Sequence, residues 1–299
     1  MNTKRLARLL LVKMALGAAV TATALLAGCS PTATPDASAT GTAPTFEHIH
    51  ELVADPTDGT LLVATHTGLY RLSIAADGTA TAVGPIGGLD FDPMGFTIAD
   101  GIAYASGHPG PTTPDTFGSP NLGLITSTDR GESWTNVSLT GETDFHGLTV
   151  ATSISGSPRV FGYDGSKQRI ITSLDGGASW SDGAEIAPRD ILAVGDLLYA
   201  TTADGLAVSS DNGATFTIDT AAPALYVVAA DQHDTIAGID VTGTVWTRPS
   251  GGNWVSGGTV AGAPQAIAVD GSRLYVADDR GIAYTDDAGA TWVVLQVKQ

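Results

Sequence analysis

The sequence predicts an all-β fold, a β-propeller of about six four-stranded blades, on the basis of three observations. An eight-residue motif that ends in an aromatic residue recurs at nearly constant spacing along the chain. Each repeat contains short alternating apolar segments separated by Gly/Asp turns, the pattern of antiparallel strands. No helical period separates these strands, which excludes parallel-sheet folds in practice. A β-sandwich and a seven-bladed propeller are the alternatives.

The N-terminal segment, residues 1–28, has the pattern of an export signal. Four basic residues precede an apolar stretch, Met14–Ala27, that is too short for a permanent membrane span. The segment ends in Leu-Ala-Gly before Cys29, the single cysteine of the chain, and this ending resembles the bacterial lipobox. The resemblance implies cleavage before Cys29 and its lipidation. We therefore expect an extracytoplasmic protein that is anchored to the cell membrane by lipid.

The segment after the cysteine, residues 29–44, is small, polar and proline-bearing, which predicts a flexible tether. We assign residues 45–299 to the propeller, which has no second cysteine for an intramolecular disulfide. Four of the 14 basic residues lie in the export signal and all 31 acidic residues lie beyond it, so the processed chain has a net charge of about −21. This charge disfavours nucleic acid and anionic lipid as partners, because both bind through Lys and Arg. We expect a monomer.

The repeated motif is Ser/Thr-x-Asp-x-Gly-x-x-Trp, here called the Asp box. It has four well-formed copies, one of them with Phe for Trp, and a worn copy, Thr247–Trp254, with Pro for Asp. The aromatic residues step by 46, 36, 38 and 38 positions, the length of one blade. Asp and Ser/Thr suit turn amides, Gly suits a positive φ and the aromatic suits a sheet surface, so we interpret the boxes as structural. The defining residues are Ser127, Asp129, Gly131, Trp134, Ser173, Asp175, Gly177, Trp180, Ser209, Asp211, Gly213, Phe216, Thr285, Asp287, Gly289 and Trp292.

Six inner strands, one for each blade, are expected from the alternating segments. Blade 1 has only a degenerate box near Ser73–Gly78, and blade 2 carries an insertion, His108–Pro120. The expected inner strands lie near Ile49–Val53, Phe96–Ala99, Leu148–Ala151, Ile191–Val194, Tyr226–Ala229 and Ile267–Val269.

The boxes resemble those of the BNR/Asp-box propellers of the sialidase and sortilin-like superfamily, which also includes plant photosystem-assembly factors. The segments His48–His50, Ala64–Leu69, Met94–Phe96, Ser106–Pro109 and Gly141–His146 are similar to a group of exported bacterial lipoprotein propellers with a "glycosyl hydrolase-like" label. The similarity runs over most of the processed chain. It implies the fold, whereas the activity has to be argued from a site.

The histidines gather at one face of the predicted propeller, here called the mouth, where inner strands start and second-to-third loops turn. His50, Met94 and His146 occupy equivalent positions at the start of the inner strands of blades 1, 2 and 3. In blades 4, 5 and 6 this position falls on Arg189, Ala224 and Gln265. The remaining mouth histidines are His48, two residues before His50, and His66 and His108 in the second-to-third loops. Only His233 is expected elsewhere, at an outer turn of blade 5.

Imidazole suits zinc and copper, and a thioether beside it favours copper. We therefore expect a Cu or Zn site among His48, His50, His66, Met94, His108 and His146. The alternative is that the histidines cap turns and Met94 packs under the inner strand. The spacing matches no standard zinc motif, so the expectation depends on the blade alignment.

Two other functions are alternatives. The resemblance to sialidases implies an arginine triad and an Arg-Ile-Pro motif. The Arg-Ile-Pro motif is absent, and only Arg189 and Arg280 among the arginines fit the mouth, which disfavours sialidase activity. A different glycosidase would need two carboxyl groups. The candidates are Asp92, Glu142 and Asp144, and Asp164 and Asp190 are further candidates. The third function is a protein-interaction or assembly platform, which needs no catalytic residue.

Overall fold

The computed structural model describes residue 46, residues 48–151 and residues 157–298. The chain divides into two units, Met1–Thr40 and Gly41–Gln299, and all described residues belong to the second. The predicted export signal, the cysteine predicted to be lipidated and the whole predicted tether lie outside the described residues. Among the residues that are described, no helix is long and apolar enough to cross a membrane.

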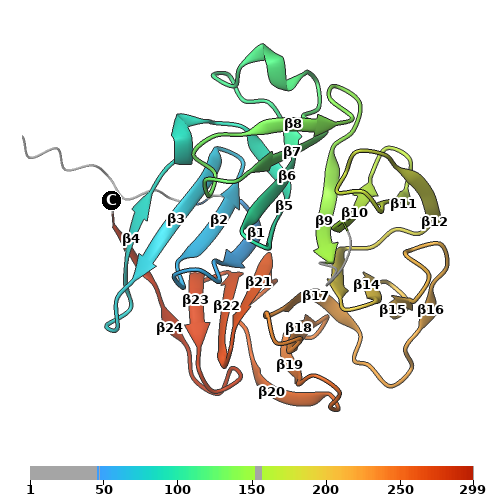
Figure 1. The fold of residues 1–299 in the computed structure, drawn as a ribbon. Coiled ribbons are helices and arrows are strands. Elements are labelled where there is room, and N and C mark those ends of the chain that lie inside the picture. The colour runs from blue at the N-terminus through green and yellow to red at the C-terminus, as the bar shows by residue number, and fades with distance from the viewer. Residues whose placement is uncertain (1–45, 47, 152–156, 299) are drawn as a thin grey trace, which may run out of the picture. The chain divides into compact units, whose positions relative to one another are not determined.

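Six antiparallel sheets stand in a ring, which confirms the prediction of an all-β, six-bladed propeller (Figure 1). Blade 1 contains β1 (Ile49–Ala54), β2 (Leu61–Thr65), β3 (Gly68–Ile74) and β4 (Thr79–Val83). Blade 2 contains β5 (Asp92–Ala99), β6 (Ile102–His108), β7 (Leu124–Ser127) and β8 (Thr135–Ser138). Blade 3 contains β9 (Phe145–Ala151), β10 (Arg159–Asp164), β11 (Arg169–Ser173) and β12 (Ser181–Glu185). Blade 4 contains β13 (Asp190–Val194), β14 (Leu197–Thr202), β15 (Gly205–Ser209) and β16 (Thr217–Ile218). Blade 5 contains β17 (Leu225–Ala230), β18 (Ile236–Asp240), β19 (Thr244–Arg248) and β20 (Val255–Thr259). Blade 6 contains β21 (Ala266–Asp270), β22 (Arg273–Asp278), β23 (Gly281–Thr285) and β24 (Val293–Val294).

The six expected inner strands are β1, β5, β9, β13, β17 and β21, and each contacts the inner strand of the next blade. Two short 3-10 turns interrupt the strand pattern, η1 (Ile86–Gly88) between blades 1 and 2 and η2 (Asp115–Phe117) in the insertion of blade 2. The insertion projects at the rim of the ring beside β7 and β8 (Figure 1).

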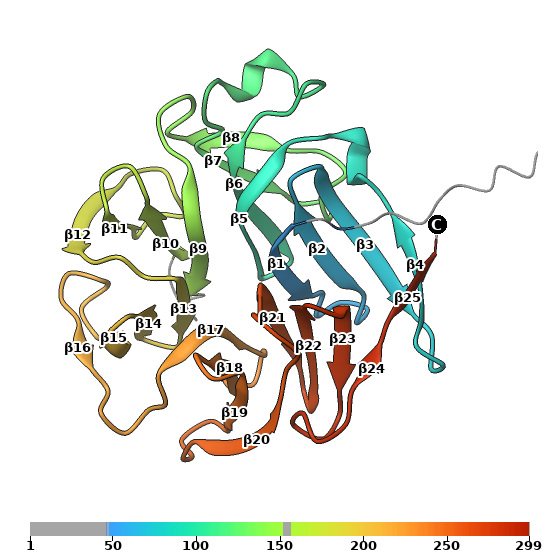
Figure 2. The same ribbon diagram turned by 180° about the vertical axis from the view of Figure 1, so that it is seen from behind.

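The ring is closed by a strand that the sequence did not predict. The chain end adds β25 (Gln296–Lys298) to blade 1, where it pairs in parallel with β4 (Figure 2). Gln296 pairs with Thr79, and its backbone N–H donates to Gly78 O at 2.9 Å. Blade 1 therefore contains both ends of the propeller, and its outer edge is covered by the last strand.

The core lies between neighbouring blades. Leu62 and Leu69 of blade 1 pack with Phe96, Ile125 and Trp134 of blade 2 in one buried cluster. Because alternate residues of a strand face opposite sides, each sheet shares one buried face with the preceding blade and one with the next. Burial of each large apolar side chain contributes about 1.5–3 kcal/mol, so these interfaces hold the ring without a disulfide.

The Asp boxes lie between the third and fourth strands and use the predicted hydrogen bonds. In blade 2, Gly131 N–H donates to Ser127 Oγ at 2.8 Å and Ser133 N–H donates to Asp129 Oδ1 at 2.9 Å. The bonds from Ser133 hold the pKa of Asp129 at about 2. The same bonds recur in the boxes of blades 3, 4 and 6. The boxes are thus structural turns.

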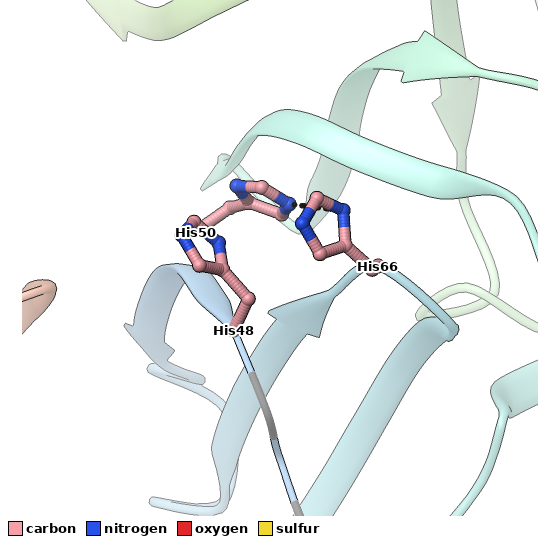
Figure 3. Close-up of side chains that lie close together, drawn as sticks. All are labelled: His48, His50 and His66. Carbon is pink, nitrogen blue, oxygen red and sulfur yellow. Dashed lines mark hydrogen bonds between the residues drawn. The ribbon is translucent and has the colours of Figure 1, made fainter.

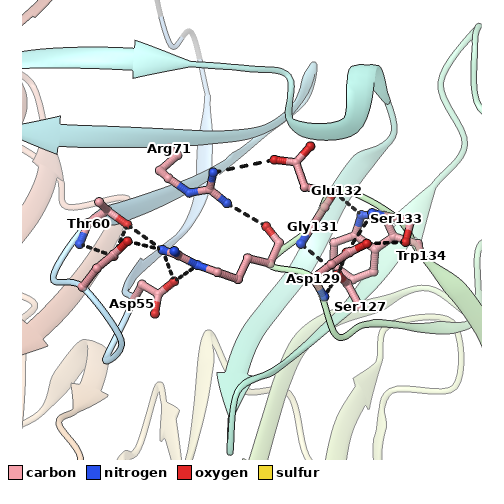
Figure 4. A network of polar contacts seen from close by, with 11 residues as sticks. Asp55, Thr60, Arg71, Ser127, Asp129, Gly131, Glu132, Ser133 and Trp134 are labelled. Atoms are coloured by element: carbon pink, nitrogen blue, oxygen red, sulfur yellow. Dashed lines mark hydrogen bonds and ion pairs between the residues drawn. The ribbon is translucent and has the colours of Figure 1, made fainter.

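Each box also joins its blade to the preceding one. In blade 2, Arg130 Nε donates to Asp55 Oδ2 at 2.8 Å in the first turn of blade 1 (Figure 4). In blade 3, the box glycine Gly177 has a φ of +97°, and a Cβ on it would lie 2.2 Å from the Leu124 side chain of blade 2. Only glycine fits this approach, which explains the position of Gly in the motif.

Candidate functional site

Three predicted mouth residues fall at the same irregularity of three inner strands. The register of each inner strand with its neighbour shifts by one residue, and the extra residue is His50 in β1, Met94 in β5 and His146 in β9. A β-bulge of this kind redirects a side chain. The structure thus places these residues at equivalent positions, as expected from the blade alignment.

The alignment was wrong for blade 5. The register shift of β17 lies between Leu225 and Val227, so the equivalent residue is Tyr226 and not Ala224. Blades 4 and 6 have no shift at this point. There, Arg189 and Gln265 directly precede the inner strands, and their backbone N–H groups donate to Thr201 O and Ala277 O, respectively.

His50, His66 and Asp92 form a compact group, here called the first triad. His50 Nε2 lies 3.1 Å from His66 Nδ1 and 3.0 Å from Asp92 Oδ1, and His66 Nδ1 lies 2.9 Å from Asp92 Oδ2. His50 and His66 belong to blade 1, whereas Asp92 is the first residue of β5 in blade 2. The triad therefore spans the contact between two blades.

His48 adds a third imidazole beside those of His50 and His66 (Figure 3). Its ring stacks on His66 with centres 4.8 Å apart, and one nitrogen from each of His48, His50 and His66 lies within 4.8 Å of the others. Burial lowers the pKa of His48, and the neighbouring rings of His50 and His66 lower it further. The lowered pKa favours the neutral imidazole, the form that binds metal ions.

The first triad holds a carboxylate between two imidazoles. Burial raises the pKa of Asp92, but hydrogen bonds from His50 and His66 outweigh this effect and keep the pKa below its ordinary value. The carboxylate is thus ionised, and each imidazole nitrogen carries either one proton or one lone pair. With one proton on each nitrogen, His50 and His66 face different oxygens of Asp92, but their two N–H groups then lie side by side with the nitrogens 3.1 Å apart. Asp92 Oδ1 is buried without a hydrogen-bond partner of suitable geometry.

His108, Asp144 and His146 form a second group, here called the second triad. His108 Nε2 lies 2.8 Å from Asp144 Oδ2, and His146 Nε2 lies 3.1 Å from Asp144 Oδ1. The hydrogen bond to Asp144 raises the pKa of His146. Both imidazoles face the Asp144 carboxylate and no contact between the two rings is found among the described residues, so one proton on each nitrogen satisfies the group. This triad joins blades 2 and 3.

A cavity of about 330 Å³ opens beside the first triad. His48, His50, His66, Met94 and His146 line it, which brings five of the six predicted ligand residues to one cavity. His108 lies outside this lining, at the end of β6 beside the insertion. The remaining histidine, His233, is exposed in the turn between β17 and β18.

The same cavity contains acidic residues that the sequence analysis missed or ranked low. Glu51 follows His50, and Asp190 is the first residue of β13. Burial raises the pKa of Glu51 well above its ordinary value, and the nearby Asp190 carboxyl group adds to this effect. Burial also raises the pKa of Asp190, to about 6. In a regular strand Glu51 would point away from the face of His50; the bulge brings both to the cavity. No sequence signal marks this bulge.

The other candidate carboxylates have structural surroundings. Asp164 is buried and accepts hydrogen bonds from the backbone N–H groups of Ser166 and Lys167, as a turn cap does. Glu142 is exposed in the turn before Asp144. Arg280 forms an ion pair with Asp278 in its own loop, whereas Arg189 lines the cavity as expected.

Comparison with known proteins supports the fold class. No protein-family model matches the chain, and no curated protein matches it. A chain of the nidogen/laminin complex superposes with a TM-score of 0.58 at 15% identity, covering 79% of this chain and 93% of that one. A GH74 enzyme of Niastella koreensis gives 0.55 at 16% identity, covering 85% and 46%. PorZ, a surface component of the type-IX secretion system of Porphyromonas gingivalis, gives 0.54 at 12% identity, covering 85% and 39%.

This chain spans less than half the length of the last two proteins. At these identities the likeness concerns the fold alone. Fold and site together define a six-bladed β-propeller with a histidine and carboxylate cluster at the start of its inner strands.

Proposed function

We propose that this protein is an extracytoplasmic, lipid-anchored propeller that binds a divalent transition metal ion, zinc or copper, at its mouth. The ligands are His48, His50, His66 and Asp92. The observation that carries the proposal is the first triad, in which two imidazole nitrogens lie 3.1 Å apart and each lies 2.9–3.0 Å from its own oxygen of the Asp92 carboxylate. A divalent cation between the two imidazoles and the carboxylate would accept lone pairs from all three groups.

The donor set and its dimensions support this proposal. Ligands of one tetrahedral zinc ion, each at about 2.0–2.1 Å, lie roughly 3.3 Å from one another. The contact of 3.1 Å between His50 Nε2 and His66 Nδ1 is close to this value. Three imidazoles and a carboxylate suit zinc and copper(II), and Met94 on the same cavity wall would add a donor for copper.

The lipid anchor and the relation to Asp-box propellers belong to the same proposal. The single cysteine after Leu-Ala-Gly supports the anchor. The shared hydrogen-bond pattern of the boxes, which has Ser or Thr as acceptor of a glycine N–H in four blades, supports membership of the Asp-box propellers.

Metal analysis tests the function. The full chain, purified in detergent without a polyhistidine tag, is stripped with EDTA, incubated with zinc or copper and desalted, and its metal content is measured by mass spectrometry. We expect about one ion per chain for the wild type and less than about a tenth for His50→Ala. The matched control is His233→Ala, which removes a histidine from an exposed turn and should keep the ion. Equal metal contents in His50→Ala and the wild type would contradict the proposal.

A second candidate function is glycoside hydrolysis, and the cavity favours one pair of carboxyl groups for it. Glu51 and Asp190 line the same cavity from blades 1 and 4, whereas Asp92 and Asp144 contact histidines. Turnover of aryl glycosides that is lost in Glu51→Gln and in Asp190→Asn, but kept in Glu142→Gln, would support this function. Lack of turnover across a broad panel would contradict it.

A further inference from the structure

Arg189 presents a fixed guanidinium group to the mouth cavity. Its Nη2 donates to Gln265 O at 3.1 Å, and its Cζ lies 5.0 Å from the centre of the Tyr226 ring. The stacking ring and the carbonyl hold the side chain in one orientation, while the residue itself remains exposed. A guanidinium held in this way is prepared for a planar carboxylate.

Arg189 also has no ionic partner among the described residues, although the chain is rich in acidic groups. Six other arginines form ion pairs, namely Arg71, Arg130, Arg159, Arg169, Arg273 and Arg280. Arg248, which forms none either, is covered by Tyr199 and Trp254 at 5.1 and 5.0 Å. Arg189 is therefore an exposed cation at the cavity that forms no ion pair with a described residue and can accept a ligand carboxylate.

Two carboxyl groups, Glu51 and Asp190, line the cavity together with Arg189. Asp190 Oδ2 accepts the backbone N–H of Val228 at 2.8 Å, which fixes the carboxyl group but leaves its other oxygen without a bond to a described residue. Glu51 lines the same wall, and its carboxyl group likewise has no bond to a described residue. Burial raises the pKa of Asp190 to about 6 and outweighs the opposing effects of the Val228 N–H and the nearby Arg189 guanidinium. These two carboxyl groups suit an ammonium group.

The size and the remaining walls limit the ligand. A volume of about 330 Å³ corresponds to roughly ten water molecules, enough for a small organic molecule. Ile49, Ile191 and Met94 supply apolar surface in the same cavity. The cavity thus offers a carboxylate receptor, an ammonium receptor and an apolar wall.

We propose that the mouth cavity binds a free amino acid with an apolar side chain, its carboxylate on Arg189 and its ammonium group on Glu51 and Asp190. The three groups that would bind the charges of the amino acid are not among the proposed metal ligands, although His48, His50 and His66 line the same cavity. Amino-acid binding and metal binding can therefore be tested separately.

Titration calorimetry with L-leucine tests the proposal on the full chain in EDTA. We expect one binding site, and Arg189→Gln weakens the affinity by about 10–100-fold, because a charge-assisted bond contributes about 1.5–3 kcal/mol. Arg248→Gln is the matched control, since that arginine is covered by aromatic rings away from the cavity, and it should leave the affinity unchanged. Asp92→Asn, a change at a proposed metal ligand outside the cavity lining, should also keep leucine binding while it loses the metal ion.

Two analogues separate the charges of the ligand. 4-Methylpentanoate lacks the ammonium group and isoamylamine lacks the carboxylate, and we expect each to bind at least about tenfold more weakly than leucine. The proposal would be overturned by an absence of leucine binding at about 10 mM, a concentration at which even millimolar affinity is detectable. Equal binding of 4-methylpentanoate, or equal leucine affinity in Arg189→Gln with an unchanged circular dichroism spectrum, would overturn it as well.

Discussion

The two triads of the mouth have the same composition, one aspartate and two histidines, but different internal contacts. In the first triad all three groups touch, and the imidazoles of His50 and His66 lie 3.1 Å apart. In the second triad each imidazole contacts the carboxylate of Asp144, and the described contacts contain no counterpart of the bond between the rings. The first arrangement suits a metal ion, whereas the second is a hydrogen-bonded link between blades.

The blade repeat explains this difference. Counted from the bulge, Asp92 and Asp144 take the same position, two residues earlier, and His66 and His108 lie in corresponding second-to-third connections. The bulge residue itself is His50 in blade 1 but Met94 in blade 2. One side chain thus separates the two sites, and in the second triad His146 of the next blade takes its place at the carboxylate. Two groups of the same composition in neighbouring blades can therefore differ in their internal contacts, which composition alone does not reveal.

The largest effect should come from exchanging that side chain in blade 1. His50→Met should lower the zinc affinity at least about 100-fold, because changes outside the ligand set already cost about 10–100-fold in metal sites. His146→Met makes the same chemical change in the second triad and should alter the affinity by less than about threefold. Competition with a chromophoric zinc chelator measures both. Equal losses in the two variants would remove the distinction between the triads.

The reverse exchange should create a site. Met94→His places an imidazole at the bulge of blade 2 beside His108 and Asp144, which reproduces the ligands of the first triad. We expect a second zinc ion per chain, with an affinity about 10–100-fold below that of the first because its surroundings are not adapted. Metal stoichiometry after equilibrium dialysis measures it, and Met94→Leu serves as the control. A stoichiometry that stays at one ion would show that the ring contact alone is not sufficient.

The repeat also explains how much of the fold could be predicted from the sequence. Trp134, Trp180 and their counterparts recur at blade length, so they fixed the frame in which the inner strands were found. The closing strand β25 was missed because three residues carry no periodicity and its partner Thr79 lies more than two hundred residues earlier. A contact of this kind depends on ring geometry, which local pattern does not contain.

The candidate site was predictable only as far as the register. His50, Met94 and His146 could be placed at the mouth because they occupy one position of the repeat. Glu51 and Tyr226 were missed because a bulge decides which way they face, and a bulge leaves no mark on an alternating sequence. The separation of His108 from the cavity was missed as well, since second-to-third loops of different length were treated as equivalent.

A smaller effect distinguishes the triads in the absence of metal. In EDTA the first triad keeps two imidazole nitrogens 3.1 Å apart, both facing Asp92, so His66→Gln, which supplies both a donor and an acceptor, should raise the free energy of unfolding by about 0.5 kcal/mol. The gain is small because the His66 side chain is 52% exposed. His108→Gln removes a satisfied bond to Asp144 and should lower the free energy of unfolding by a similar amount. Urea unfolding measures both free energies. A loss of stability in both variants would contradict the predicted difference between the two triads.

The smallest effect is the pH dependence of the second triad. The hydrogen bond to Asp144 raises the pKa of His146 above 6.5, so its contribution to stability is fully present below pH 6.5 and is lost as the pH rises through the folded-state pKa. The free energy of unfolding of the wild type in EDTA should therefore exceed that of His146→Gln at about pH 5.5, and the difference should shrink toward about pH 9. It should stay below about 1 kcal/mol, because the His146 side chain is 47% exposed and solvent screens the pair. If the difference in free energy of unfolding instead grew with pH, the fold would favour the neutral form of His146. That form could bind a metal ion, and the distinction between the two triads would be lost.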